Sequence, residues 1–108
     1  MHTTYVRFLN LIKAVKEATP EWPYLDAVED HLLDQLAMCW VSKKPVTAFE
    51  AVQLMPCLSQ STVHTKLQNL IKKGIVELVQ DPADRRVKHV RATTITVNYF
   101  TNIESQLK

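Results

Sequence analysis

Glycine and cysteine are scarce in this sequence, and long hydrophobic runs are absent. The single glycine, Gly74, leaves no phosphate-cradling loop of the G-x-x-x-x-G-K type. Two cysteines are too few for the disulfide framework of a small secreted domain, and they are typical of the reducing cytosol. No run of about 18 apolar residues occurs, so we expect no membrane span. These absences indicate a small cytoplasmic domain.

Catalytic and metal-binding patterns are absent as well. Neither G-x-S-x-G nor H-E-x-x-H occurs in the chain. Glu29, Asp30 and Asp34 are expected on the solvent-facing side of a helix. No zinc-ligand spacing joins the candidate ligands, which are His31, Cys39, Cys57, His64 and His89. We therefore expect no enzyme activity, no cofactor and no metal.

The two cysteines have simple structural interpretations. Cys39 stands beside Trp40 on an apolar helix, where a small core residue is expected. Cys57 lies in a turn, and no basic residue within four positions activates its thiol. Control by oxidation of Cys57 stays open as an alternative.

Composition and charge are those of a globular domain with a basic second half. The chain has 108 residues, of which 46% are hydrophobic and 22% are charged. Its net charge is only +2. Residues 1–54 carry five Lys and Arg against seven Asp and Glu, whereas residues 55–108 carry eight against four. Such asymmetry is typical of a partner that bears phosphates, although a solvated surface gives the same count.

Helical periodicity and caps predict four helices before residue 75. An apolar stripe predicts a helix within residues 1–19, which Pro20 and Pro23 end. Asp26 is expected to cap a second helix, and the Thr47–Glu50 capping box a third that runs to Met55. The fourth helix, residues 59–73, begins at the cap Ser59 and ends before Gly74. Its buried face should hold Val63, Leu67, Leu70 and Ile71.

The remainder of the chain predicts a β-hairpin and a last helix. Residues 75–79 and 87–91 alternate around turn-forming residues, which is typical of a hairpin. Its basic part, residues 80–91, is called the wing below. Residues 95–97 favour a strand, but apolar spacing beyond them favours a helix over 95–108, which we prefer. The fold class is mainly α with a small β-hairpin wing, a winged helix-turn-helix. Residues 1–108 should form one domain whose core is residues 25–94.

A family resemblance rests on two stretches of sequence at a fixed separation. The first is Leu58-Ser59-Gln60-Ser61-Thr62-Val63, which runs on to Lys73-Gly74-Ile75-Val76. The second is Asp81-Pro82-Ala83-Asp84-Arg85-Arg86, followed by Val90-Arg91-Ala92-Thr93. Together they resemble the DNA-binding domain of MarR-type transcriptional regulators over roughly residues 25–94. The resemblance implies a DNA-binding regulator that reads its operator through a winged helix-turn-helix.

The fourth helix is the candidate recognition helix, and it should enter the major groove. If Val63, Leu67 and Leu70 face the core, a row of hydrogen-bonding side chains faces outward, and an α-helix fits the groove that displays base edges. The first turn has free backbone N–H groups that favour a phosphate. The candidate DNA-binding residues of this helix are Ser59, Gln60, Ser61, Thr62, His64, Thr65, Lys66, Gln68 and Lys72. An ordinary solvated helix face is the alternative.

The wing is the second candidate DNA-binding element. An Arg at a hairpin tip can reach into a narrow minor groove. The resemblance implies that Arg86 enters the groove and that Asp84 orients it, which we expect through a bidentate fork. The candidate residues are Asp84, Arg85, Arg86, Lys88 and Arg91. Backbone phosphates are expected to bind Lys66, Lys72, Lys73, Lys88 and Arg91. A surface ion pair without function is the alternative for Asp84 and Arg86.

The chain departs from the family at its ends. MarR-type proteins usually dimerise through long helices from both termini, whereas only about 14 residues follow Thr94 here. A homodimer through the N- and C-terminal helices is still expected, because half-site binding usually requires one. A small-molecule effector stays uncertain. The expected function is sequence-specific binding of double-stranded DNA; the alternative is a winged-helix protein–protein interaction module that binds no DNA.

Overall fold

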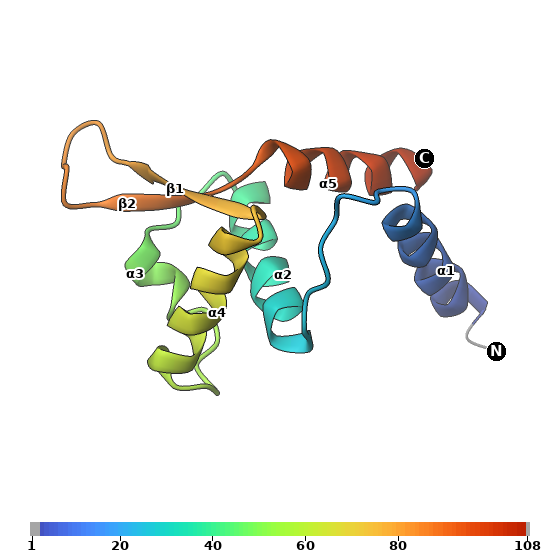
Figure 1. Cartoon of the computed structure of the whole chain (residues 1–108), viewed down its shortest axis with the longest axis horizontal. Helices are drawn as coiled ribbons and strands as arrows, with labels where there is room; N and C mark the ends of the chain where they lie inside the picture. Colours follow the sequence, from blue (N-terminus) through green and yellow to red (C-terminus); the bar gives the residue numbers. More distant parts are fainter. Residues whose placement is uncertain (1–2, 108) are drawn as a thin grey trace. The chain divides into compact units, whose positions relative to one another are not determined.

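Five helices and one β-hairpin make up residues 3–107, the part of the chain that the computed structural model describes (Figure 1). The chain forms two compact units. One is the continuous segment Leu25–Thr93, and the other joins the N-terminal residues up to Tyr24 with the C-terminal residues from Thr94. Within the described residues no helix is both long and apolar enough for a bilayer crossing. The expected mainly α fold with a hairpin wing is confirmed.

Helix α2 (Ala27–Val41) begins as expected, at the cap Asp26. The Asp26 carboxylate accepts from the Glu29 N–H, and the Glu29 carboxylate accepts from the Asp26 N–H, which completes a capping box. Leu32, Leu33 and Leu36 are buried along one side of the helix. These leucines place α2 in the centre of its unit.

Helix α3 (Ala48–Ala51) has the predicted Thr47–Glu50 capping box but is shorter than predicted. The expected extension to Met55 is wrong. After Ala51 the backbone changes to tighter turns, in which Gln53 N–H donates to Glu50 and Leu54 N–H donates to Ala51. Pro56 disfavours helical geometry in the residue before it, so the helix cannot continue through this segment.

Helix α4 (Gln60–Lys72) begins at Ser59, whose hydroxyl accepts from the Thr62 N–H. Val63, Leu67 and Leu70 are buried as predicted, whereas Ile71 is only half-buried. The helix ends at Lys72 with the C-cap Lys73, and Gly74 follows with the left-handed backbone angle φ of 76° that a glycine adopts without a steric cost. The Gly74 and Ile75 N–H groups then donate back to Ile71 and Leu70.

The hairpin follows directly as strands β1 (Val76–Gln80) and β2 (Lys88–Ala92). They pair antiparallel, with Val76 opposite Ala92 and Gln80 opposite Lys88. Val76 and Val90 are buried, which anchors the hairpin on the core.

The outer edge of β2 is covered by the loop between α2 and α3. Val90 N–H donates to the Val46 carbonyl at 2.7 Å, and Thr47 forms a bridge with His89. The Trp40 indole N–H donates to the Val90 carbonyl at 3.0 Å. Both polar groups of the Val90 backbone are therefore satisfied by residues far away in the sequence.

Two ion pairs join α2 to α4. Lys73 Nζ lies 2.5 Å from Glu29 Oε1, and Lys66 Nζ lies 2.6 Å from Asp26 Oδ2. The expectation that Glu29 faces solvent is wrong, because Glu29 is only 1% exposed. Its position in the capping box and its partner Lys73 explain how a carboxylate is tolerated there.

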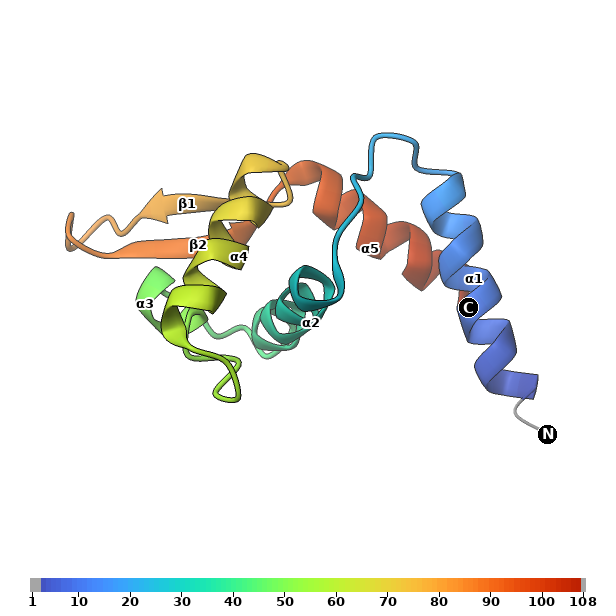
Figure 2. The same ribbon diagram turned by 60° about the horizontal axis from the view of Figure 1, so that its bottom comes forward.

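The second unit pairs α1 (Thr3–Glu17) with α5 (Thr94–Gln106), as Figure 2 shows. Val15 and Tyr99 are buried, and the ring of Trp22 stacks on Tyr99 with centroids 4.0 Å apart. Residues 95–97, which also favour a strand, are helical. The outermost residues of both expected terminal helices, residues 1, 2 and 108, lie outside the described part.

Candidate nucleic-acid interface

The outward face of α4 is polar and accessible. Gln60, Ser61, His64 and Thr65 are exposed, as the spacing against the buried Val63 requires. The Thr65 hydroxyl donates to the Ser61 carbonyl at 3.1 Å, which leaves its oxygen lone pairs on the surface. This face has hydrogen-bond donors and acceptors of short reach and carries no large apolar side chain.

Two other candidate DNA-binding residues, Ser59 and Thr62, form the N-terminal cap of α4. The hydroxyls of Ser59 and Thr62 lie 2.8 Å apart, and Ser59 also accepts from the Thr62 N–H. Both side chains are exposed. They are placed at the N-terminal end of α4, beside the N–H groups that the helix does not use.

The basic residues of α4 fall into two groups. Lys72 is exposed, whereas Lys66 and Lys73 are half-buried and paired with Asp26 and Glu29. The hydrogen bond from Lys66 lowers the pKa of Asp26 and raises the pKa of Lys66. A phosphate would therefore compete with Asp26 for the Lys66 ammonium. Gln68 is half-buried on the same helix.

Asp81 organises the turn of the wing. One carboxylate oxygen accepts from the N–H groups of Ala83 and Asp84, at 2.7 and 3.1 Å. The other lies 2.8 Å from His89 Nε2. The hydrogen bond with His89 holds the pKa of Asp81 below its ordinary value. One carboxylate thus ties the turn to the returning strand.

Asp84 and Arg86 form the predicted pair at the tip, but without the predicted fork. Asp84 Oδ1 accepts from the Arg86 backbone N–H at 3.0 Å and from its Nε at 3.3 Å. This geometry is not a bidentate fork between the carboxylate and the guanidinium, because one carboxylate oxygen accepts from both Arg86 donors. The Arg86 side chain is 91% exposed, so the rest of its guanidinium projects into solvent.

The remaining cations of the wing are also accessible. Arg85, Lys88 and Arg91 are exposed, and the Arg85 carbonyl accepts from the Gln80 side chain at 2.9 Å. Figure 2 shows the hairpin projecting past α3 and α4. The wing and the outward face of α4 belong to the same unit, Leu25–Thr93.

Phe49 lies beside the wing and was missed by sequence reasoning. It is 70% exposed at the start of α3, in a hollow of about 250 Å³ that Arg86, Val87 and Lys88 also line. Its position directly after the Thr47 cap was a usable signal, because a side chain in the first turn of a short helix is hard to bury.

Metal binding finds no geometry to support it. Within residues 3–107, no three His, Cys, Asp or Glu side chains come together as a metal site would require. Cys57 is exposed, and Cys39 is half-buried.

Comparisons of the sequence find no relative: no protein-family model matches it, and neither does any curated protein. Comparisons of the structure do. The chain resembles a MepR–DNA complex from S. aureus with a TM-score of 0.63, 18% identity, and coverage of 98% of this chain and 76% of that one.

Two further neighbours extend the match. The heme sensor PefR from Streptococcus agalactiae has a TM-score of 0.56, 19% identity, and coverage of 98% and 71%. The adhesin competence repressor AdcR from Streptococcus pyogenes has a TM-score of 0.51, 20% identity, and coverage of 97% and 76%. These neighbours are MarR-family winged-helix regulators. The fold of this chain is therefore the MarR-type winged helix, as the resemblance over roughly residues 25–94 implied.

Proposed function

We propose that this chain is a transcriptional regulator that binds double-stranded DNA in a sequence-specific manner. The observation that carries the proposal is the pairing, within one unit, of an exposed polar helix face with an exposed basic hairpin. The fold neighbours include a protein whose structure was determined with DNA. A protein-docking module would have no use for four exposed cations on one short hairpin.

The proposed reading element is α4 in the major groove. Gln60, Ser61, His64 and Thr65 offer both donors and acceptors, which match the mixed pattern of base edges there. The free N–H groups at the start of α4 favour a backbone phosphate close to Ser59 and Thr62. Lys72 adds a phosphate contact that sets register rather than sequence.

The proposed second element is the wing in the neighbouring minor groove. The contact of Asp84 with Nε restricts the Arg86 side chain before DNA arrives, so less rotamer entropy is lost on binding. Narrow minor grooves have a negative potential that attracts an Arg side chain. Arg85, Lys88 and Arg91 would neutralise nearby phosphates.

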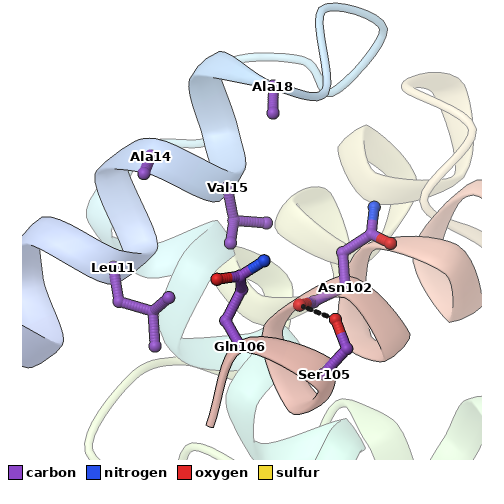
Figure 3. Close-up of a pocket in the computed structure, with 7 residues that line it drawn as sticks. All are labelled: Leu11, Ala14, Val15, Ala18, Asn102, Ser105 and Gln106. Carbon is purple, nitrogen blue, oxygen red and sulfur yellow. Dashed lines mark hydrogen bonds between the residues drawn. The ribbon is translucent and has the colours of Figure 1, made fainter.

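A homodimer through α1 and α5 completes the proposal. Tyr5, Phe8 and Leu9 on α1 are 46–61% exposed, an unusual state for three large apolar side chains on one helix. A cleft of about 420 Å³ lies between the two helices, and Figure 3 shows the side chains that line it. One side of its lining is apolar, with Leu11, Ala14 and Val15 on α1 and Ala18 just after it; the other side is polar, with Asn102, Ser105 and Gln106 on α5.

DNA binding is tested by fluorescence anisotropy with labelled duplex DNA over a series of salt concentrations. We expect the affinity of the wild type to fall steeply with salt, and we expect Arg85→Ala/Arg86→Ala to bind more weakly with a shallower slope. The matched control is Lys43→Ala/Lys44→Ala, which removes the same charge outside the proposed interface. Failure of the wild type to bind at low salt would refute the proposal.

Sequence preference is tested separately, by selection from a random duplex library. Gln60→Ala or His64→Ala should relax the selected sequence, whereas Lys72→Ala should weaken binding to all sequences alike. Unchanged selectivity in both of the first two variants would show that α4 does not read bases. The dimer is tested by light scattering, where Leu9→Asp should give the monomer mass.

A further inference from the structure

A groove of about 460 Å³ lies along the wing within the unit Leu25–Thr93, where the α2–α3 loop meets β2. Lys43 and Lys44 line it from the loop, and His89 and Arg91 line it from β2. The ring of Trp40 also lines it, and the Trp40 indole N–H is already bonded to the Val90 carbonyl. The volume is in the range of sites that hold small molecules.

The charge of this groove is positive and mostly uncompensated. Lys43, Lys44 and Arg91 are exposed, and none of them pairs with a carboxylate within the described residues. Asp81 is the acidic residue of the lining, and both of its oxygens already accept hydrogen bonds from the turn and from His89. The three cations exceed the one carboxylate of the lining by two; Glu77, opposite Arg91 on β1, does not line the groove.

Lys43 adopts a conformation that a lysine rarely adopts. Its φ is 59°, in the left-handed region, at the position just after α2 where a glycine is usual. Its N–H donates to Trp40 and the Lys44 N–H donates to Cys39, which is the hydrogen-bond pattern of a glycine-terminated helix. A lysine in this conformation costs about 1–2 kcal/mol in steric strain, which a binding role of its ammonium would explain.

His89, which lines the groove, has one buried polar atom without a hydrogen-bond partner. Its Nε2 faces Asp81, and its Nδ1 is buried and has no hydrogen bond. Buried polar atoms without a partner are rare in native proteins, so a water or a ligand from outside the chain is expected at this atom. An acidic O–H can donate to Nδ1, and an oxyanion can accept from it when the ring is protonated.

We propose that this groove binds a small phosphate monoester with an apolar body. A monoester carries a charge of about −1.5 to −2 near pH 7, which matches the local excess of positive charge. The Arg91 guanidinium has the fork geometry that phosphate oxygens accept, and the lysines supply point charges. Trp40, Pro45 and Pro82 offer the apolar surface on which the body packs. The groove shares Arg91 with the proposed DNA interface, but binding of the monoester does not require that the chain binds DNA.

The probe is phenyl phosphate, followed by two-dimensional NMR of the labelled full chain. We expect saturable shifts at the Trp40 indole N–H and at the amides of Lys43, His89 and Arg91. Inorganic phosphate, which lacks the ring, and phenol, which lacks the charge, should each bind at least tenfold more weakly. In Lys43→Ala/Lys44→Ala the affinity for phenyl phosphate should fall at least tenfold.

The matched control is Arg85→Ala/Arg86→Ala, which removes two cations of the wing that do not line the groove. An equal loss in this variant would overturn the proposal, because it would reveal diffuse attraction rather than a site. Shifts that do not saturate would overturn it as well. So would a DNA-binding salt slope that becomes shallower in Lys43→Ala/Lys44→Ala, since that result assigns the two lysines to the DNA backbone. Wild-type chain that binds phenyl phosphate but no DNA would refute only the regulator proposal.

Discussion

Replacing Glu29 by glutamine should weaken the ion pair that joins α2 to α4, because glutamine has the shape of glutamate but no charge. The side chain is 2% exposed and accepts from Lys73 Nζ and from the Asp26 N–H. A glutamine can still accept from the Asp26 N–H, but it cannot compensate the charge of Lys73. Breaking a buried pair costs about 3–5 kcal/mol and an exposed pair about 0–1 kcal/mol. Because Lys73 is 31% exposed and keeps some water, we expect a loss of about 2 kcal/mol.

The pH dependence of this loss has a definite sign. Burial raises the pKa of Glu29. The hydrogen bonds from Lys73, the Asp26 N–H and the Asn69 side chain lower it by more than burial raises it, so the pKa lies below its ordinary value of 4.5. A carboxyl with a depressed pKa contributes stability above that ordinary value and loses it as the pH falls through the folded-state pKa. The difference between wild type and Glu29→Gln should therefore be full at pH 7 and shrink on the acid side of pH 4.5.

Urea unfolding between pH 2 and pH 7 measures both quantities. A loss of about 2 kcal/mol also predicts a Tm lower by about 8–16 °C for a domain of this size. The control is Glu104→Gln on the exposed face of α5, which should change neither value. In a double-mutant cycle, Lys73→Met should remove most of the effect of Glu29→Gln. A loss under about 0.5 kcal/mol at pH 7, or one that stays constant down to pH 2, would refute the reasoning.

Three further substitutions test local geometry, each by urea unfolding. Lys43→Gly should raise stability by about 0.5–1 kcal/mol, because relief of the left-handed strain exceeds the entropy that glycine adds to the unfolded chain; a lower stability would contradict the strain. Trp40→Phe should cost about 1 kcal/mol or more, since Val90 loses its indole donor, and a neutral result would mean that water replaces it. Ser59→Ala should cost about 1 kcal/mol through the lost cap of α4, with Ser105→Ala as the neutral control.

Local sequence signals predicted the helix starts well. Asp26, Thr47 and Ser59 cap their helices because each acts on N–H groups two or three residues away, so the information is contained in a short window. The end of α4 at Gly74 has the same origin. The polar face of α4 and the basic wing could be predicted for the same reason, because periodicity alone separates their exposed residues from the buried ones.

Contacts across long stretches of chain could not be predicted. Glu29 and Lys73 are 44 residues apart, and Trp40 and Val90 are 50 apart. Periodicity puts Glu29 among the polar residues of α2, and only the approach of α4 turns that position into a buried one. The left-handed backbone of Lys43 could not be predicted for a different reason, because a lysine gives no sequence signal for that conformation.

The two helices of the discontinuous unit are synthesised at different times. Helix α1 leaves the ribosome first, but its partner α5 is encoded after the whole of Leu25–Thr93. At bacterial or eukaryotic elongation rates the roughly 75 intervening residues take roughly 4–15 s to make. The continuous unit has time to fold during this interval. The apolar side chains of α1 meanwhile stay exposed, because α5 has not yet been synthesised. If the chain forms the proposed homodimer, nascent chains on neighbouring ribosomes could meet through these side chains before either chain is finished.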